Sequence, residues 1–220
     1  MPVDAIAFDA FGTLFDLEGL RPALRDEFGE AGDATFDGFV ARLVPWMWHS
    51  SASGRFQHLP EVAAAAITAS AGAAGLDLHD GQAEQFAAGL RSLPPFPDVA
   101  DGLDALSRRP LAILSNGTLD GIQALVGAAG LRDRFAHLLA ADQAGRYKPS
   151  PDLYALAPRA FRTRADRILM VSSNEWDVAG AAQFGMRTAW LSRGRAPSWV
   201  LGVEADYAVD ALADLALALR

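Results

Sequence analysis

Four short groups of residues in this sequence carry side chains that could take part in chemistry. They are, in chain order, Asp9 with Thr13, Ser115 with Asn116, Lys148, and Ser172 with Asn174 and Asp177. An ionised carboxylate can attack carbon directly and form an ester that water later hydrolyses, which divides one difficult displacement into two easier steps. A neighbouring lysine would keep such a carboxylate ionised, because a nearby opposite charge favours the charged form. Any one of these residues could serve only a turn or a helix cap, but the whole set indicates catalysis.

Short apolar runs precede most of these groups and predict the strands that position them. Residues 3–8, 111–114 and 168–171 each end just before a polar group, and residues 188–191 form a fourth run. Helix-like stretches separate the runs, and this alternation predicts an α/β, Rossmann-like core with a mostly parallel sheet flanked by helices. Ligands bind beyond the carboxyl ends of such strands, so we expect the polar groups to meet in one crevice.

The region from about residue 17 to residue 93 breaks this alternation. It has helical periodicity over residues 20–30, 36–50, 60–74 and 80–91 and lacks a convincing strand. The proline-rich residues 94–97 then stiffen the return of the chain. We therefore predict a catalytic core of residues 1–15 and 95–220, with a helical cap of residues 16–94 inserted after the first strand.

Composition excludes several classes of function. The chain has 220 residues, no cysteine, and a net charge of -8 from 27 acidic and 19 basic side chains. Without cysteine, zinc-thiolate, iron–sulfur and cysteine-hydrolase chemistry are excluded. The acidic balance argues against nucleic acid as a partner. No segment approaches the roughly 20 apolar residues of a membrane span, and we expect a cytoplasmic protein without a membrane partner.

Four motifs together resemble those of the haloacid dehalogenase superfamily, and more narrowly its L-2-haloacid dehalogenase (type II) branch. They are Phe-Asp-Ala-Phe-Gly-Thr-Leu-Phe-Asp at 8–16, Leu-Ser-Asn-Gly at 114–117, Tyr-Lys-Pro at 147–149 and Val-Ser-Ser-Asn-Glu-Trp-Asp at 171–177. The resemblance covers nearly the whole chain in order. It implies hydrolysis of short L-2-haloalkanoic acids to 2-hydroxy acids, a small carboxylate substrate, no cofactor, no metal and a homodimer.

The resemblance also implies roles for single residues. Asp9 would be the nucleophile, and Lys148 would orient it and keep it ionised. Thr13 and Ser172 would donate hydrogen bonds to the same carboxylate. Asp177 would fix the position of the lysine ammonium, and Asn174 would position the hydrolytic water. The candidate substrate-binding residues are Phe11, Ser115, Asn116, Arg42, Tyr154 and Trp176.

Phe11 separates this reading from a phosphatase. Phosphatases of the superfamily carry a second aspartate two residues after the nucleophile, as the acid for the leaving alcohol, and bind magnesium. A phenyl ring cannot donate a proton, whereas a halide needs none to leave. A phosphatase is therefore the weakest of the readings.

The cap departs from the family pattern at one position. The family's halide-binding arginine lies eight residues before a tryptophan, matched here by Trp48, and counting back gives Val40. Arg42 lies about half a helical turn further on, so only a local shift would bring it into the site. His49 and Arg55 are the other candidates for this role. Trp46 and Trp48 are predicted to belong to the core of the cap rather than to the substrate wall.

Two alternatives stay open. The first is the same aspartyl-ester mechanism on a small acid without halogen, such as a strained-ring amino acid, and the absence of the cap arginine favours it. The second is a non-catalytic protein that retains the fold. The retained lysine and carboxylates argue against the second alternative, since a merely structural core needs no such set in one crevice.

Overall fold

A six-stranded sheet forms the centre of the computed structural model, which describes residues 2–220. Its strands are β1 (Ala5–Phe8), β2 (Leu111–Ser115), β3 (His137–Ala140), β4 (Ile168–Ser172), β5 (Arg187–Leu191) and β6 (Tyr207–Val209). They lie in the order β3-β2-β1-β4-β5-β6, and every neighbouring pair is parallel. The predicted α/β fold with a mostly parallel sheet is therefore confirmed.

Two strands of the sheet were not predicted. β3 has four residues and starts at a histidine, so its apolar run is too short to stand out. β6 has three residues, none of them buried, and pairs only with β5 at the edge of the sheet. The four predicted strands are the ones with longer apolar runs, which is typical of strands covered on both faces.

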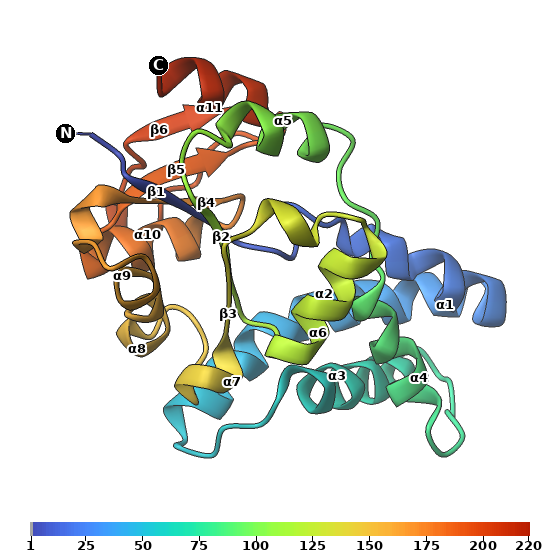
Figure 1. Cartoon of the computed structure of the whole chain (residues 1–220). Helices are drawn as coiled ribbons and strands as arrows, with labels where there is room; N and C mark the ends of the chain where they lie inside the picture. Colours follow the sequence, from blue (N-terminus) through green and yellow to red (C-terminus); the bar gives the residue numbers. More distant parts are fainter. Residues whose placement is uncertain (1) are drawn as a thin grey trace.

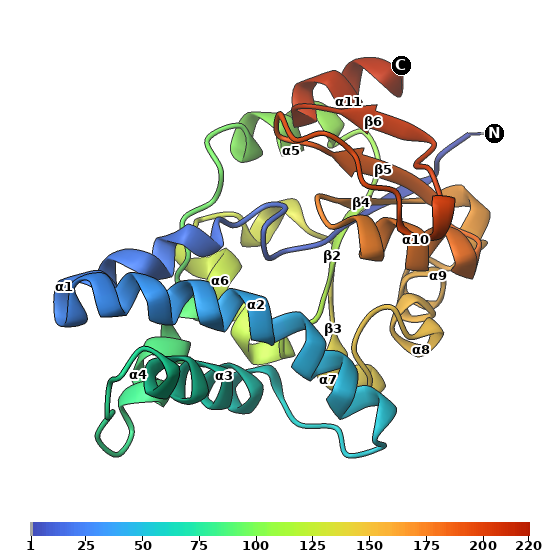
Figure 2. The same cartoon turned by 180° about the vertical axis from the view of Figure 1, so that it is seen from behind.

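Helices cover both faces of the sheet (Figures 1 and 2). α5 (Val99–Leu106), α6 (Leu119–Ala128) and α11 (Leu212–Ala218) lie on one side. The short α7 (Ala141–Ala144) follows β3, and α8 (Pro151–Tyr154), α9 (Leu156–Phe161) and α10 (Glu175–Phe184) lie on the other side. This layering buries the sheet and leaves its strand ends as the place for a site.

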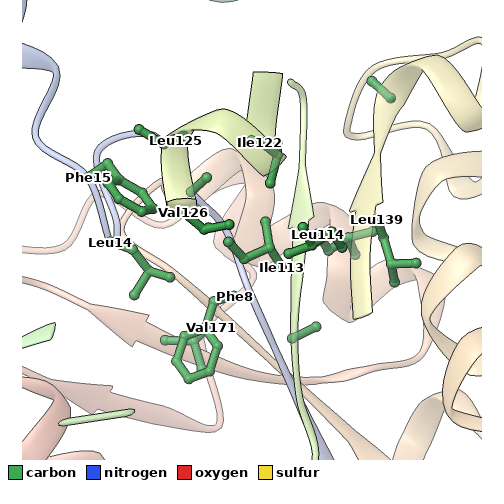
Figure 3. Close-up of a cluster of buried hydrophobic side chains, with 14 of the residues drawn as sticks. Phe8, Leu14, Phe15, Ile113, Leu114, Ile122, Leu125, Val126, Leu139 and Val171 are labelled. Atoms are coloured by element: carbon green, nitrogen blue, oxygen red, sulfur yellow. The ribbon is translucent and has the colours of Figure 1, made fainter. Parts of the chain in front are cut away.

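The core between the sheet and α6 is built from large apolar side chains (Figure 3). Ile122, Leu125 and Val126 of α6 are fully buried beside the sheet residues Phe8 and Ile113. Leu14 and Phe15, from the loop after β1, belong to the same cluster. The loop that carries the first polar group is therefore anchored on the core at its far end.

The region after β1 is helical, as predicted. It contains α1 (Arg21–Phe28), α2 (Glu30–Ala52), α3 (Leu59–Ala73) and α4 (Gln82–Ala88), with 3-10 turns at Leu17–Leu20 and Gly89–Arg91. Gly29 separates α1 from α2 with a φ of 60°, so the helix predicted over 20–30 ends earlier and the next one begins earlier. Within residues 2–220, no helix combines the length and the apolar character that crossing a membrane requires.

The chain leaves and re-enters the α/β layer at one place. The amide of Asp16 donates to the carbonyl of Pro94 at 2.9 Å, and the amide of Phe96 donates to the carbonyl of Leu14 at 2.9 Å. These paired connections support the predicted division into a core of 1–15 and 95–220 and a cap of 16–94. We keep that division as a proposal, and we use the word cap for residues 16–94.

Candidate active site

The carboxyl ends of three adjacent strands bring the polar groups together. In the sheet register, Phe8 of β1 lies beside Ile113 of β2 and Val171 of β4. The residues that follow these strand positions therefore face one edge of the sheet. Asp9 comes directly after β1, while Ser115 and Ser172 are the last residues of their strands.

Asp9 lies at the centre of this group and accepts hydrogen bonds from three side chains. Its Oδ2 accepts from Thr13 Oγ1 at 3.0 Å and from Asn174 Nδ2 at 2.9 Å. Its Oδ1 lies 3.1 Å from the Nζ of Lys148. Asp9 itself is only 4% exposed, so these contacts lie in a setting of low polarity, where they are stronger than in water.

Lys148 is fully buried and bridges two carboxylates. Its ammonium lies 2.8 Å from Asp177 Oδ2, in addition to its contact with Asp9. Burial acts to lower the pKa of Lys148, but the charges of Asp177 and Asp9 outweigh it and raise the pKa above its ordinary value. The residue is therefore a cation that orients Asp9 and not a base.

Asp177 is held from its other side by a tyrosine. Tyr154 Oη donates to Asp177 Oδ1 at 2.8 Å, and burial raises the pKa of Asp177 in spite of the opposing effect of Lys148. Tyr154 is fully buried and lies outside the residues that line the cavity at Asp9. The structure therefore places Tyr154 behind Asp177 and not in the cavity, where it was predicted to contact the substrate.

The two predicted serines, Ser172 as a donor to Asp9 and Ser115 as a substrate contact, both make local hydrogen bonds to backbone amides instead. Ser172 Oγ accepts from the amide of Asn174 at 3.1 Å, so it shapes the turn after β4. Its predicted hydrogen bond to Asp9 is absent among residues 2–220, and Asn174 occupies that place. Ser115 Oγ likewise accepts from the amide of Gly117 at 3.1 Å and lies outside the cavity lining.

Asn116 connects the cavity to the loop that contains Lys148, which we call the lysine loop. Its Oδ1 accepts from the amide of Lys148 at 2.8 Å, and the residue lines the cavity beside Asp9. Phe11 and Trp176, both predicted to contact the substrate, line the same cavity. These three residues and Asn174 form its wall on the core side.

The cavity has a volume of about 60 Å³ and is closed by the cap. Its lining on the cap side is entirely apolar and consists of Leu17, Leu43, Val44, Met47, Leu59 and Leu90. The nucleophile candidate therefore faces a pocket with a polar floor and an apolar roof. Such a pocket fits a small molecule with one polar end.

The cap does not place an arginine in this cavity. Arg42 Nη1 donates to the carbonyl of Gly38 at 3.0 Å and lies 3.3 Å from Ser70 Oγ of α3, so it points along the cap. Arg42 is therefore not brought to the cavity, because the helix phase directs its side chain away from Asp9. Val40, at the position matched to the family arginine, is 41% exposed. His49 and Arg55 are exposed and lie outside the cavity lining.

Sequence reasoning missed the part played by Trp48. It is 38% exposed rather than part of the cap core, and Trp46 is 36% exposed. Trp48 Nε1 donates to the carbonyl of Lys148 at 3.1 Å, and its ring meets Trp176 edge to face at 5.8 Å. The indole thus ties α2 to the lysine loop, a contact between residues 100 positions apart that no local pattern signals.

The acidic side chains at the site are already paired. Lys148 lies between Asp9 and Asp177 and pairs with both, and the second residue after Asp9 is Phe11, which has no ligating atom. In the part of the chain that the structure describes, no group of three or more histidine, aspartate or glutamate side chains is arranged to hold a metal ion. What the arrangement offers is a buried, oriented carboxylate beside an apolar pocket.

Comparison with known proteins agrees with this geometry. Residues 3–185 match the family model of the haloacid dehalogenase-like hydrolases. Haloacetate dehalogenase H-2 of Moraxella sp. (strain B) is 35% identical over 193 residues, which cover 87% of this chain and 86% of that protein. The (S)-2-haloacid dehalogenase of Pseudomonas sp. (strain YL) is 35% identical over 207 residues, with 90% and 89% covered.

Solved structures are similar over the whole length. L-2-haloacid dehalogenase from Xanthobacter autotrophicus, with chloropropionic acid covalently bound, superposes with a TM-score of 0.94 at 30% identity. The match covers 99% of this chain and 98% of that one. The similarity therefore includes the cap as well as the sheet.

Proposed function

This chain belongs to the haloacid dehalogenase-like hydrolases, in the L-2-haloacid dehalogenase branch, and from this we propose that it removes halide from short L-2-haloalkanoic acids. The product is the 2-hydroxy acid, with an ester of Asp9 as the intermediate. One observation carries the proposal. Asp9 is buried and oriented by Lys148, Thr13 and Asn174, while Phe11 lines the adjoining cavity in place of a second carboxylate.

The two oxygens of Asp9 differ in a way that suggests their roles. Among the described residues, only Lys148 donates to Oδ1, whereas Oδ2 accepts from both Thr13 and Asn174. We assign the attack on C2 of the substrate to Oδ1, which forms a C–O bond as the halide leaves with the electron pair. Oδ2 then becomes the carbonyl oxygen of the ester. Thr13 and Asn174 would stabilise the negative charge that develops on this oxygen when water attacks the carbonyl carbon.

Water would attack the carbonyl carbon of the ester, so that one proton is released and the carboxylate of Asp9 is regenerated. Asn174 lies at the cavity wall and is our candidate for positioning this water. Because substitution occurs once at C2 and hydrolysis occurs at the ester carbonyl, the configuration at C2 should invert. Asp177 holds the ammonium of Lys148 in place during both steps.

The size of the cavity supports a short substrate. A cavity needs roughly 10–15 Å³ to hold one water molecule. A cavity of about 60 Å³ therefore has room for about four to six non-hydrogen atoms. A two- or three-carbon haloacid is of this size. We assign its carboxylate to the core side near Asn116, which lines the cavity, and its halogen to the apolar cap side.

The apolar lining on the cap side supports one alternative substrate. No arginine lines the described cavity. A strained-ring amino acid, which releases no halide, would not need one. The same Asp9 ester would form when the ring opens, so the substrate and not the nucleophile separates the two candidates.

The test is halide release from L- and D-2-chloropropionate in buffer that contains chelator. We expect release from the L isomer alone, with inverted product, and no turnover by Asp9→Asn. The amide is isosteric, so circular dichroism should show that this variant is folded. Release that needs added magnesium would refute the proposal. Absence of release with ring opening of azetidine-2-carboxylate would move the assignment to the alternative.

We also propose that the chain forms a homodimer through the cap. Val40, Trp46 and Trp48 of α2 are exposed large apolar side chains, which often mark an interface. Light scattering after size exclusion should give twice the chain mass of 23.3 kDa. A monomer at micromolar concentration would contradict this assignment.

A further inference from the structure

A second and much larger hollow lies next to the cavity at Asp9. It has a volume of about 490 Å³ and runs between the cap and the loop that precedes α6. Small side chains line much of it, namely Ala64, Thr68, Ala87 and Ala88 from the cap, and Gly117 and Gly121 from the core. We call this hollow the cap groove.

The cap groove and the cavity share a wall. Phe11, Leu59 and Leu90 line both spaces. Leu59 begins α3 and Leu90 lies in the turn after α4, so two of the three shared side chains belong to the cap. A group attached to the reacting carbon would therefore pass these side chains on its way to the cap groove.

We propose that the cap groove receives an uncharged apolar substituent on C2 of the substrate. This inference rests on the proposed function and extends its substrate class to longer 2-haloalkanoic acids. The cavity of about 60 Å³ is filled by the carboxylate, C2 and the halogen, whereas the cap groove of about 490 Å³ has room for several further carbons. The apolar lining stabilises such a chain by removing it from water.

The charges at the cap groove select against a second carboxylate. Glu61 and Glu84 line it, and Arg91, the one cation among its described lining residues, forms an ion pair with Asp120 at 2.5 Å. The four groups together carry two net negative charges. A terminal carboxylate on the substituent would meet this field and would also lose its own hydration, so a neutral end is favoured.

The experiment compares kcat/KM for 2-bromopropionate, 2-bromobutanoate and 2-bromohexanoate, and adds 2-bromohexanedioate as the charged analogue. We expect kcat/KM to rise by up to about fourfold for each added methylene, the equivalent of ~0.8 kcal/mol for each buried CH₂. The dioate should fall below 2-bromohexanoate by at least tenfold. Glu84→Gln should narrow that gap.

Two variants test where the alkyl substituent of the substrate binds. Thr68→Phe fills the cap groove from α3 and should lower the ratio of kcat/KM for 2-bromohexanoate over 2-bromopropionate. Ala69→Phe is the matched control, because Ala69 is also exposed on α3 but lies outside the groove lining, and it should keep the wild-type ratio. Ala88→Phe repeats the test from the other wall if Thr68→Phe does not fold.

The outcomes separate this inference from the proposed function. If 2-bromopropionate is turned over but kcat/KM falls as the alkyl chain of the substrate lengthens, the assignment of the cap groove is overturned. The proposed dehalogenase function would not be affected by this result. An unchanged ratio in folded Thr68→Phe or Ala88→Phe would overturn it as well. Failure on every substrate, including 2-bromopropionate, would instead refute the proposed function.

Discussion

Tyr154→Phe isolates the hydroxyl that holds Asp177. Tyr154 Oη donates to Asp177 Oδ1 at 2.8 Å and to the Asp177 carbonyl at 3.2 Å, and the residue is 0% exposed. The substitution keeps the ring and removes only the donor. A hydrogen bond to a charged group contributes about 1.5–3 kcal/mol to stability. Without the hydroxyl, Asp177 Oδ1 stays buried without this donor, which adds a desolvation cost. We therefore expect the free energy of unfolding to fall by about 2–3 kcal/mol.

For a domain of this size, about 1 kcal/mol lowers Tm by roughly 2–4 °C, so the expected shift is roughly 4–12 °C. Thermal unfolding followed by circular dichroism measures it. Catalysis should change too, because Asp177 anchors the ammonium of Lys148. We expect kcat to fall several-fold while KM for the haloacid stays close to the wild-type value, since Tyr154 lies outside the cavity lining.

Tyr147→Phe is the matched control. Tyr147 is 1% exposed, and its hydroxyl donates at 2.7 Å to the carbonyl of Gln57, a neutral acceptor. Loss of a hydrogen bond to a neutral group costs about 0.5–1.5 kcal/mol, so this variant should lose less stability than Tyr154→Phe. Equal losses of stability in the two variants, or an unaltered kcat in Tyr154→Phe, would refute the role given to the Tyr154 hydroxyl.

Three further predictions concern the lysine, the packing of α10 and the leaving group. The pKa of Lys148 is raised, so its ammonium and the stability that it contributes are fully present below the ordinary pKa of 10.5 and are lost as pH rises through the raised pKa. The fall of kcat/KM on the alkaline side of the pH profile should therefore lie above pH 10.5. A fall near pH 9 would contradict this prediction. Gly180→Ala would place a Cβ 2.6 Å from Tyr154 Oη, so urea denaturation should show a loss of about 1–3 kcal/mol, whereas Gly72→Ala, with open space in α3, should gain up to about 1 kcal/mol. Since the cap side of the cavity offers no cation, halide release from 2-halopropionates should follow bromide over chloride, with fluoride slowest because the smallest anion is the most costly to desolvate; ion chromatography measures the order, and fluoride release as fast as chloride release would exclude the apolar roof as the site of departure.

Local sequence determined the parts of this protein that local physical chemistry controls. Apolar runs ending in polar residues predicted β1, β2, β4 and β5, because a strand buried on both faces needs such a run. Parallel strands present their carboxyl ends at one edge, so the grouping of Asp9, Lys148 and Asp177 followed from topology and from the motifs. Helical periodicity likewise predicted the helices of the cap. The break between α1 and α2 at Gly29 lies earlier in the sequence than the gap predicted between residues 30 and 36.

Only the tertiary structure decided where individual side chains point. Arg42 turns to Ser70, Tyr154 supports Asp177 from behind, and Trp48 reaches the carbonyl of Lys148 across the cap boundary. Each of these contacts joins residues between 23 and 100 positions apart. Helix phase and the packing of one layer on another set such directions, and neither can be read from residue types in a short window. The sequence alone therefore determined which residues could do the chemistry, and the tertiary packing decided which of them reach Asp9 or the cavity beside it.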